Sequence, residues 1–223
     1  MAYKARLLVM YQILISALRE TLFMVGSASL ITVCVGIPLG IFIAGIASSP
    51  FKLIKGMYYL FYSLIQFAKC TPSLLIMLLC IPLSNILINH IVSYIASTLI
   101  PLSIVGSLLL AQKVHEIVSA LSEQWSSTSK AMGASTGQTL RLILLPEGFQ
   151  RIFGSCFHVC SLIVGFSAVA GALGAGGLGQ LAIEKSINEP EPLYVGACIL
   201  MLVALQQLIQ YTGTLVVQQK QPR

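Results

Sequence analysis

Residues 21–47 read TLFMVGSASLITVCVGIPLGIFIAGIA, a stretch of 27 residues without a single charged side chain. A helix that crosses the hydrocarbon core of a bilayer needs about 20 mostly apolar residues. This stretch therefore predicts a membrane-spanning helix. A shorter apolar segment at 7–18 leads into it across Arg19 and Glu20. Because no small-x-small cleavage pattern follows that segment, we expect it to remain attached as an amphipathic leading helix.

The composition of the whole chain is that of a membrane protein. Of the 223 residues, 57% are hydrophobic and 9% are charged, whereas soluble domains carry about 25% charged residues. All seven acidic residues are glutamates, which excludes mechanisms that need an aspartate in this chain, such as a Ser-His-Asp triad or a Walker B metal ligand. If the protein works with ATP, another chain hydrolyses it. The net charge of +6 is not gathered in a basic run, so no nucleic acid partner is expected.

Further apolar stretches predict an all-α, polytopic membrane protein with five transmembrane helices. The predicted spans lie at about 21–47, 70–89, 91–111, 149–173 and 193–217. Residues 57–68 are apolar and aromatic but too short to span, and we expect an interfacial helix there. The chain is thus predicted to be one transmembrane domain, 1–223, with a cytoplasmic loop at about 112–148.

Basic residues select the orientation, because Lys and Arg accumulate in cytoplasmic segments. With the N-terminus outside, nine of the 13 Lys and Arg residues fall in cytoplasmic segments and four fall outside. An odd number of spans puts the two termini on opposite sides. We therefore expect the N-terminus outside and the C-terminus in the cytoplasm.

The polar loop between the third and fourth spans divides at Gly133. Before it, residues 121–132 have the polarity of a short surface helix. After it, Ser135 and Gln138 form a capping box that starts a second short helix, which we expect to stop at Pro146. Connections of this length are usually functional. Two short helices that meet at a glycine predict a compact protrusion that docks a partner.

The second notable segment is GFSAVAGALGAGGLG at 165–179, in which eleven of fifteen residues are Gly, Ala or Ser. Small residues let helix backbones approach closely in lipid, so this segment predicts a helix-packing surface, within the chain or across a dimer seam. The residues of this predicted seam are Ala168, Gly171, Ala172, Ala175 and Gly176. The same segment matches G-x-G-x-x-G, but a dinucleotide site needs that motif after a strand in a βαβ unit. No phosphate-loop motif occurs in the sequence.

Two other readings of the fourth span are rejected on chemical grounds. Cys156, His158 and Cys160 are one ligand short of a zinc site, and we interpret the cysteines as small thiols inside a helix, with no metal expected. Ser167 and His158 lie nine residues apart, or about 13 Å along one helix, too far for a nucleophile and its base.

Residues 129–135, SKAMGAS, followed by LLPE at 144–147, resemble the cytoplasmic signature of binding-protein-dependent ABC importer permeases. That signature runs E-A-A-x-x-x-G, then about eleven residues, then L-P, and Gly133 stands at this distance from the L-P pair. The Gly-rich segment at 165–179 and QLIQYTG at 207–213 are similar to permease subunits of methionine ABC importers.

The resemblance implies a type I ABC importer permease fold in a bacterial inner membrane, and a subunit that is not an enzyme. It implies a homodimer in the lipid bilayer, ATP-binding ABC ATPase subunits on the cytoplasmic face, and a substrate-binding lipoprotein that delivers methionine. ATP and Mg²⁺ would be bound by the ATPase, and this chain would hold no cofactor. The residues expected to couple this chain to the ATPase are Glu123, Lys130, Ala131, Met132, Gly133, Ala134 and Ser135.

The signature is incomplete in this chain. Ser127 stands where the family has its leading glutamate, and Thr128 stands where it has the first alanine. Lys69 replaces an arginine usual near the second span, which keeps the charge but loses the planar fork. Glu123, one helical turn before Ser127, is the residue we expect to supply the missing carboxylate.

Three alternative functions remain at this point. The same fold could move another amino acid or a small peptide. A secondary transporter would show internal repeats and ionisable residues within the spans, and neither is apparent here. A non-transporting membrane scaffold is compatible with the composition, and the coupling signature favours transport over it.

Overall fold

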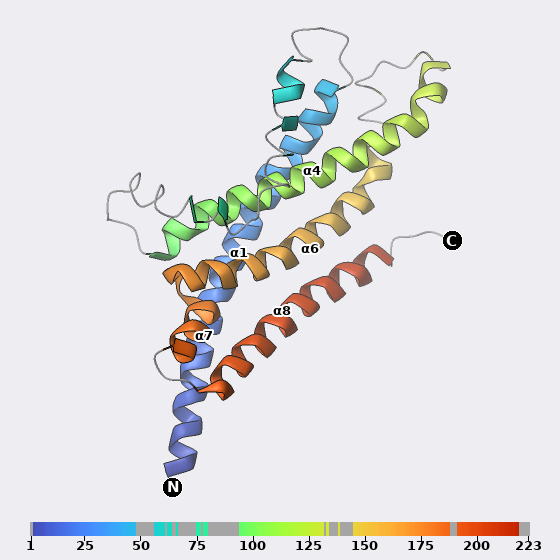
Figure 1. Ribbon diagram of the computed structural model, residues 1–223. Helices are drawn as coiled ribbons and strands as arrows, with labels where there is room; N and C mark the ends of the chain where they lie inside the picture. Colours follow the sequence, from blue (N-terminus) through green and yellow to red (C-terminus); the bar gives the residue numbers. More distant parts are fainter. Residues whose placement is uncertain are drawn as a thin grey trace.

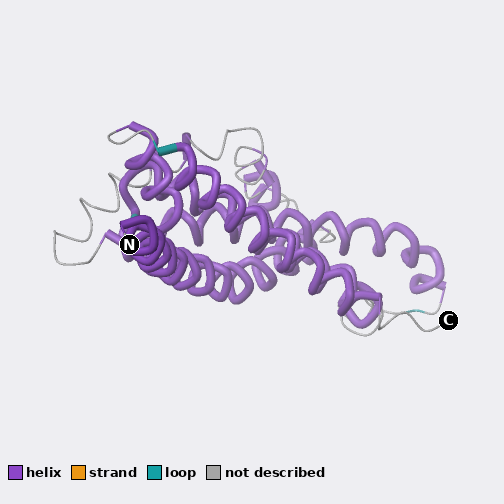
Figure 2. The backbone as a smooth tube through the Cα atoms, turned by 90° about the horizontal axis from the view of Figure 1, so that it is seen from below, coloured by secondary structure: helices purple, strands orange, loops and turns teal. Residues whose placement is uncertain are grey.

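The computed structural model describes residues 2–47, 56–60, 62–63, 66, 75–76, 78–79, 94–131, 133, 138, 145–187 and 191–218. Nearly all of this part of the chain is helical (Figures 1 and 2). The elements are α1 (Ala2–Ala47), α4 (Tyr94–Ala131), α6 (Leu145–Ala170), the π-helical turn η2 (Gly171–Ala175), α7 (Gly177–Ile187) and α8 (Pro192–Gln218). Helices are the expected result, because lipid offers no hydrogen-bond partner to backbone polar groups and a helix satisfies them internally.

Four helices in the described residues are long and apolar enough to cross a membrane. They are Met10–Ala47, Thr98–Leu121, Gly148–Ala175 and Pro192–Val217. The predicted spans at 149–173 and 193–217 agree with the last two to within two residues. The predicted span at 70–89 lies almost entirely outside the described residues.

The first helix begins earlier than its predicted span. α1 is continuous from Ala2, so the leading segment at 7–18 and the span at 21–47 are one helix. The two charged residues between them do not interrupt it, because Arg and Glu are good helix formers. Leu14 and Ala17 of the leading segment are buried in a small cluster with residues of α7 and α8. The leading segment is therefore a packed part of the fold.

The predicted end of the third span is wrong. The sequence placed the end of the span at 111, a loop from 112 and a separate surface helix at 121–132, whereas α4 runs unbroken to Ala131. No glycine or proline occurs between 107 and 131, and polarity alone does not end a helix. Gln112 and His115, which began the predicted loop, are buried.

Pro146 is the second residue of α6. The short helix that we expect to stop at Pro146 lies outside the described residues, apart from Gln138. Proline is tolerated in the first helical turn, because the amide that it lacks would have no partner there.

The described helices pack around α4 and α6. α1 has its most extensive contact with α4, and α6 contacts both α4 and α8, which lie on either side of it in Figure 1. The main core contains side chains from α1, α4 and α6, including Met24, Ala28, Leu102, Leu110, Val114, Val118, Leu121, Val159 and Ile163.

Two glycines of α1 set its distance from α4. A Cβ atom on Gly36 would lie 2.9 Å from the Leu110 Cβ, and one on Gly40 would lie 2.7 Å from the Ala111 carbonyl oxygen. Gly36 and Gly40 have the G-x-x-x-G spacing that lets two membrane helices approach until their backbones nearly touch. Any larger residue at Gly40 would push the two helices apart.

We predict that Gly40→Ala destabilises the protein and that Gly45→Ala does not. The added methyl group at 40 meets α4 backbone, and overpacking of this kind costs roughly 1–3 kcal/mol. Gly45 is the matched control, because a Cβ there has no neighbour within 4 Å. Thermal unfolding in detergent, followed by loss of the monodisperse species, measures both. Equal midpoints for the two variants would show that the α1–α4 distance is set elsewhere.

Candidate functional site: helix junction and coupling segment

The junction between α6 and α7 is built from glycines in the left-handed region of backbone conformation. Gly174, Gly176 and Gly177 have φ angles of 95°, 94° and 74°. Residues with a Cβ rarely adopt such angles, whereas glycine does so at little cost. These three positions end the α6 helix through η2 and fold α7 back against it.

Part of the predicted seam is a contact within the chain. A Cβ atom on Gly171 would lie 2.7 Å from the Gln180 backbone nitrogen and 2.8 Å from the Gly179 Cα, and Gly179 in turn abuts the Ala168 backbone. Ala175 is buried in the main core. Ala168 and Gly171 thus pack within one chain.

The other two predicted seam residues have different surroundings. Ala172 is exposed on the surface of the single chain. Gly176 is half-buried, and a Cβ atom on it would lie 3.1 Å from the Glu20 carboxylate. A seam between two copies remains a prediction, and of the five residues Ala172 is the one placed to reach a second copy.

Two side chains of α1 cap the first turn of α7. The Glu20 carboxylate Oε2 accepts a hydrogen bond of 2.9 Å from the Gly177 amide, and the Thr21 Oγ1 accepts one of 2.9 Å from the Leu178 amide. The Thr21 hydroxyl donates in turn to the Ala17 carbonyl at 3.0 Å. The first amides of a helix have no partner within the helix, and its N-terminus favours negative charge. Glu20 and Thr21 therefore cap α7 from another helix, in the role that the residue directly before a helix usually has.

Sequence reasoning missed this capping pair. Each hydrogen bond joins residues that are 157 positions apart, so no local sequence pattern predicts it. One signal was available: Glu20 is a carboxylate at the edge of a long uncharged stretch, and such a group needs a partner.

The coupling segment begins on the extension of α4 beyond its span. Glu123 is exposed on this extension, and Lys130 and Ala131 form the end of the helix. Gly133 is exposed in a turn with φ of 70°, and a Cβ there would meet no atom within 4 Å. A left-handed glycine just past a helix end is the usual C-terminal cap. Met132, Ala134 and Ser135 lie outside the described residues.

The Ser167 hydroxyl forms its hydrogen bond within its own helix. It is buried and donates a hydrogen bond of 2.7 Å to the Val164 carbonyl. Ser167 and His158 lie on the same continuous helix α6, as the sequence reasoning assumed.

Long apolar helices, a capped glycine junction and a helix that extends past its span define a multi-pass helical membrane protein. A protein-family model described as "Binding-protein-dependent transport system inner membrane component" matches residues 36–211. The chain belongs to this family and is thus a membrane component of a transport system. This confirms the family inferred from the signature around Gly133.

Curated relatives cover almost the whole chain. The "Probable D-methionine transport system permease protein MetI" of Vibrio cholerae is 26% identical over 201 residues, which are 90% of this chain and 89% of the relative. The protein of the same name from Haemophilus influenzae is 25% identical over 198 residues, 88% of this chain and 92% of the relative.

Solved structures share the fold. A chain of the MetNI methionine ABC transporter in inward-facing conformations is similar with a TM-score of 0.83, over 96% of this chain and 98% of that chain, at 23% identity. A chain of an amino acid ABC transporter with histidines gives a TM-score of 0.71 over 94% and 97%, at 20% identity. The predicted ABC permease fold is therefore confirmed.

We predict that Thr21→Val loosens the helix junction. Valine has nearly the same shape but leaves the Leu178 amide without its acceptor, which costs about 1–3 kcal/mol when the group is buried. Thr212→Val is the control, because that exposed hydroxyl only donates to Ile209 of its own helix. Hydrogen exchange by mass spectrometry should become at least tenfold faster in peptides that contain residues 177–181 of Thr21→Val. Unchanged exchange there would contradict the capping role.

Proposed function

We propose that this protein is the membrane-spanning subunit of an ATP-driven importer of methionine, in the L form, the D form or both. The observation that carries the proposal is the chain-long similarity to methionine permeases, with a TM-score of 0.83 over 96% of the chain. It is supported by relatives whose names specify D-methionine transport and which align over about nine-tenths of the chain.

Under this proposal, the protein works in the bacterial inner membrane as a homodimer with two ATPase subunits. Its N-terminus lies outside and its C-terminus lies in the cytoplasm. The ATPase binds ATP and Mg²⁺ and carries out hydrolysis, since this sequence has neither a phosphate loop nor an aspartate. A substrate-binding lipoprotein delivers methionine from the outer side.

The extension of α4 suggests how hydrolysis is coupled to transport. α4 leaves its candidate span at Leu121 and continues for ten residues to Ala131, about 15 Å along a helix axis. A displacement of the coupling residues is thereby passed into the span without an intervening loop. Within the membrane the same helix packs on α1 and α6, so it can move both.

Uptake by the reconstituted complex tests the substrate. We expect ATP-dependent accumulation of labelled methionine when this chain, the ATPase and the binding protein are present together, and neither uptake nor ATP hydrolysis by this chain alone. Unlabelled methionine should compete, and histidine should not. Competition by another amino acid in place of methionine would favour a permease of that amino acid, the alternative to which the similarity at a TM-score of 0.71 points.

Substitutions at Gly133 test the coupling contact. Gly133→Asn keeps the left-handed turn, because asparagine tolerates φ > 0, whereas Gly133→Val strains it by about 1 kcal/mol. Within the described residues neither side chain would meet a neighbour at Cβ. If Gly133 contacts the ATPase, both variants should assemble as dimers and lose at least fivefold in uptake per assembled complex.

The two variants also separate coupling from capping. If the glycine only caps α4, Gly133→Asn should transport within twofold of the wild type, and only Gly133→Val should be less stable. That result would remove Gly133 from the coupling contact.

A further inference from the structure

In the part of α8 that follows Val203, the exposed surface has a polar stripe and a mostly apolar side. Gln207, Gln210 and Thr214 are all exposed and stand at i, i+3 and i+7, so they share one face of the helix. The other exposed face is mostly apolar and carries Ala204, Leu208, Tyr211 and Leu215, with the exposed Thr212 beside them. If lipid surrounded the whole exposed side of the helix, the polar side chains of this stripe would be unfavourable there.

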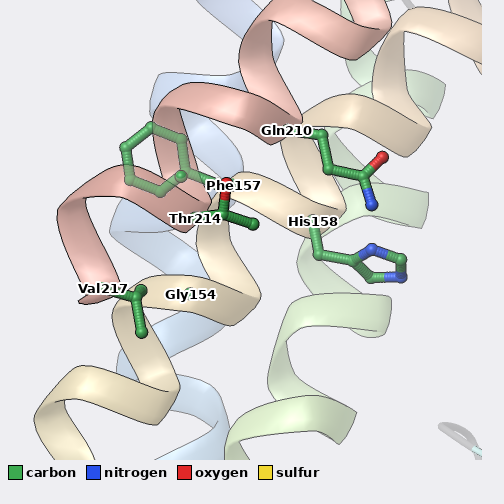
Figure 3. A pocket seen from close by; sticks show the side chains of 7 residues that line it. Gly154, Phe157, His158, Gln210, Thr214 and Val217 are labelled. Carbon is green, nitrogen blue, oxygen red and sulfur yellow. The ribbon is translucent and has the colours of Figure 1, made fainter.

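The polar stripe borders a cavity between α6 and α8. The cavity has a volume of about 310 Å³, and its lining residues are Gly154, Phe157, His158, Gln210, Gly213, Thr214 and Val217. The His158 imidazole and the Gln210 carboxamide extend side by side from the two helices (Figure 3). The two helices approach closely here, because a Cβ on Gly213 would run into the Phe157 Cβ. This close approach brings polar groups of α6 and α8 onto one surface.

Two of these polar groups lie deep in their candidate spans, whereas Gln210 and Thr214 lie seven and three residues from the end at Val217. His158 is ten residues from the span end at Gly148, and Gln207 is ten residues from the end at Val217. Each distance corresponds to about 15 Å along a helix, which places both groups inside a hydrocarbon core of roughly 30 Å. A carboxamide or imidazole at that depth is unfavourable against lipid tails, because its hydrogen bonds to water would be lost. His158 and Gln207 therefore face water or protein.

A second copy of the chain fits this surface poorly. Contacts between membrane helices favour small residues, and the stripe carries long, flexible Gln side chains. Small exposed residues occur farther along, at Gly165 of α6 and Ala172 of η2, which are seven and fourteen residues beyond His158. This region is the better surface for a second copy, and it leaves the polar stripe open.

We propose that His158, Gln207, Gln210 and Thr214 line a water-filled passage and contact the transported solute. Imidazole, carboxamide and hydroxyl groups both donate and accept hydrogen bonds, so together they can bind the ammonium and carboxylate groups of a zwitterionic amino acid. The stripe carries no ionised carboxylate or ammonium of its own, in keeping with a solute of zero net charge. The water-filled passage is argued from this chain alone, and the identity of the solute rests on the proposed function.

Cysteine labelling tests the passage without reference to the solute. Gln207→Cys, Gln210→Cys and Leu208→Cys are expressed with the ATPase partner in membrane vesicles open on both sides, and the unmodified chain gives the background from native cysteines. The probe is a charged methanethiosulfonate, which reacts with thiolates, and a thiol ionises only where water reaches it. We expect labelling at 207 and 210 to be at least tenfold faster than at the matched apolar position 208.

Two outcomes would overturn the proposal. Equally slow labelling at all three positions would place the stripe against lipid. Slow labelling at 207 and 210 with efficient disulfide cross-linking between two copies would make the stripe a dimer contact. Two stripe positions are used so that a folding defect in one variant leaves the other to decide.

Labelling in the presence of methionine tests the identity of the solute separately from the existence of the passage. Methionine that slows labelling at 210 at least threefold supports both the passage and the proposed substrate. Fast labelling that methionine leaves unchanged but another amino acid slows supports the passage and counts against methionine import.

Discussion

The fold depends on how backbone amides are satisfied where a helix breaks inside an apolar environment. Where η2 meets α7, three left-handed glycines turn the chain, and the buried amides of Gly177 and Leu178 have no acceptor within their own helix. Glu20 and Thr21 of α1 supply the acceptors. The cap fixes α7 on α1, and the contact between Ala168 and Gly179 fixes it on α6. The contacts that satisfy these amides and pack α7 thus hold α1, α6 and α7 together at one point.

Glycines also bring helices close together elsewhere in the molecule. Lipid tails are as apolar as leucine, so membrane helices gain little from burying leucine against leucine and gain more from intimate backbone packing. Gly36 and Gly40 bring α1 onto α4, and Gly213 brings α8 onto α6. The first of these contacts ties α1 to the helix that leads to the coupling segment. The second brings the polar side chains of α6 and α8 together.

Much of the fold was predictable from the sequence, and the errors have physical causes. Apolar length defined the spans at 149–173 and 193–217, because glycines and polar residues bound both stretches. It failed for α4, where polarity was taken as the end of a helix although no residue between 107 and 131 breaks one. Gly133 was correctly singled out as a conformational break. The cap at Glu20 and Thr21 was not predictable from local pattern, because its partners meet only in the folded protein. The G-x-x-x-G pair at 36 and 40 was visible in the sequence and was overlooked.

The long-range cap also has a consequence for biogenesis. The ribosome makes Glu20 and Thr21 more than 150 residues before Gly177 and Leu178, so the acceptors are already in the membrane when the donors emerge. The glycine turn can close as soon as α7 leaves the translocation machinery, without waiting for α8. With the order of the two segments reversed, the amides would be made before their acceptors. The direction of translation and the placement of the cap are thus matched, and the last helix is added to a junction that is already complete.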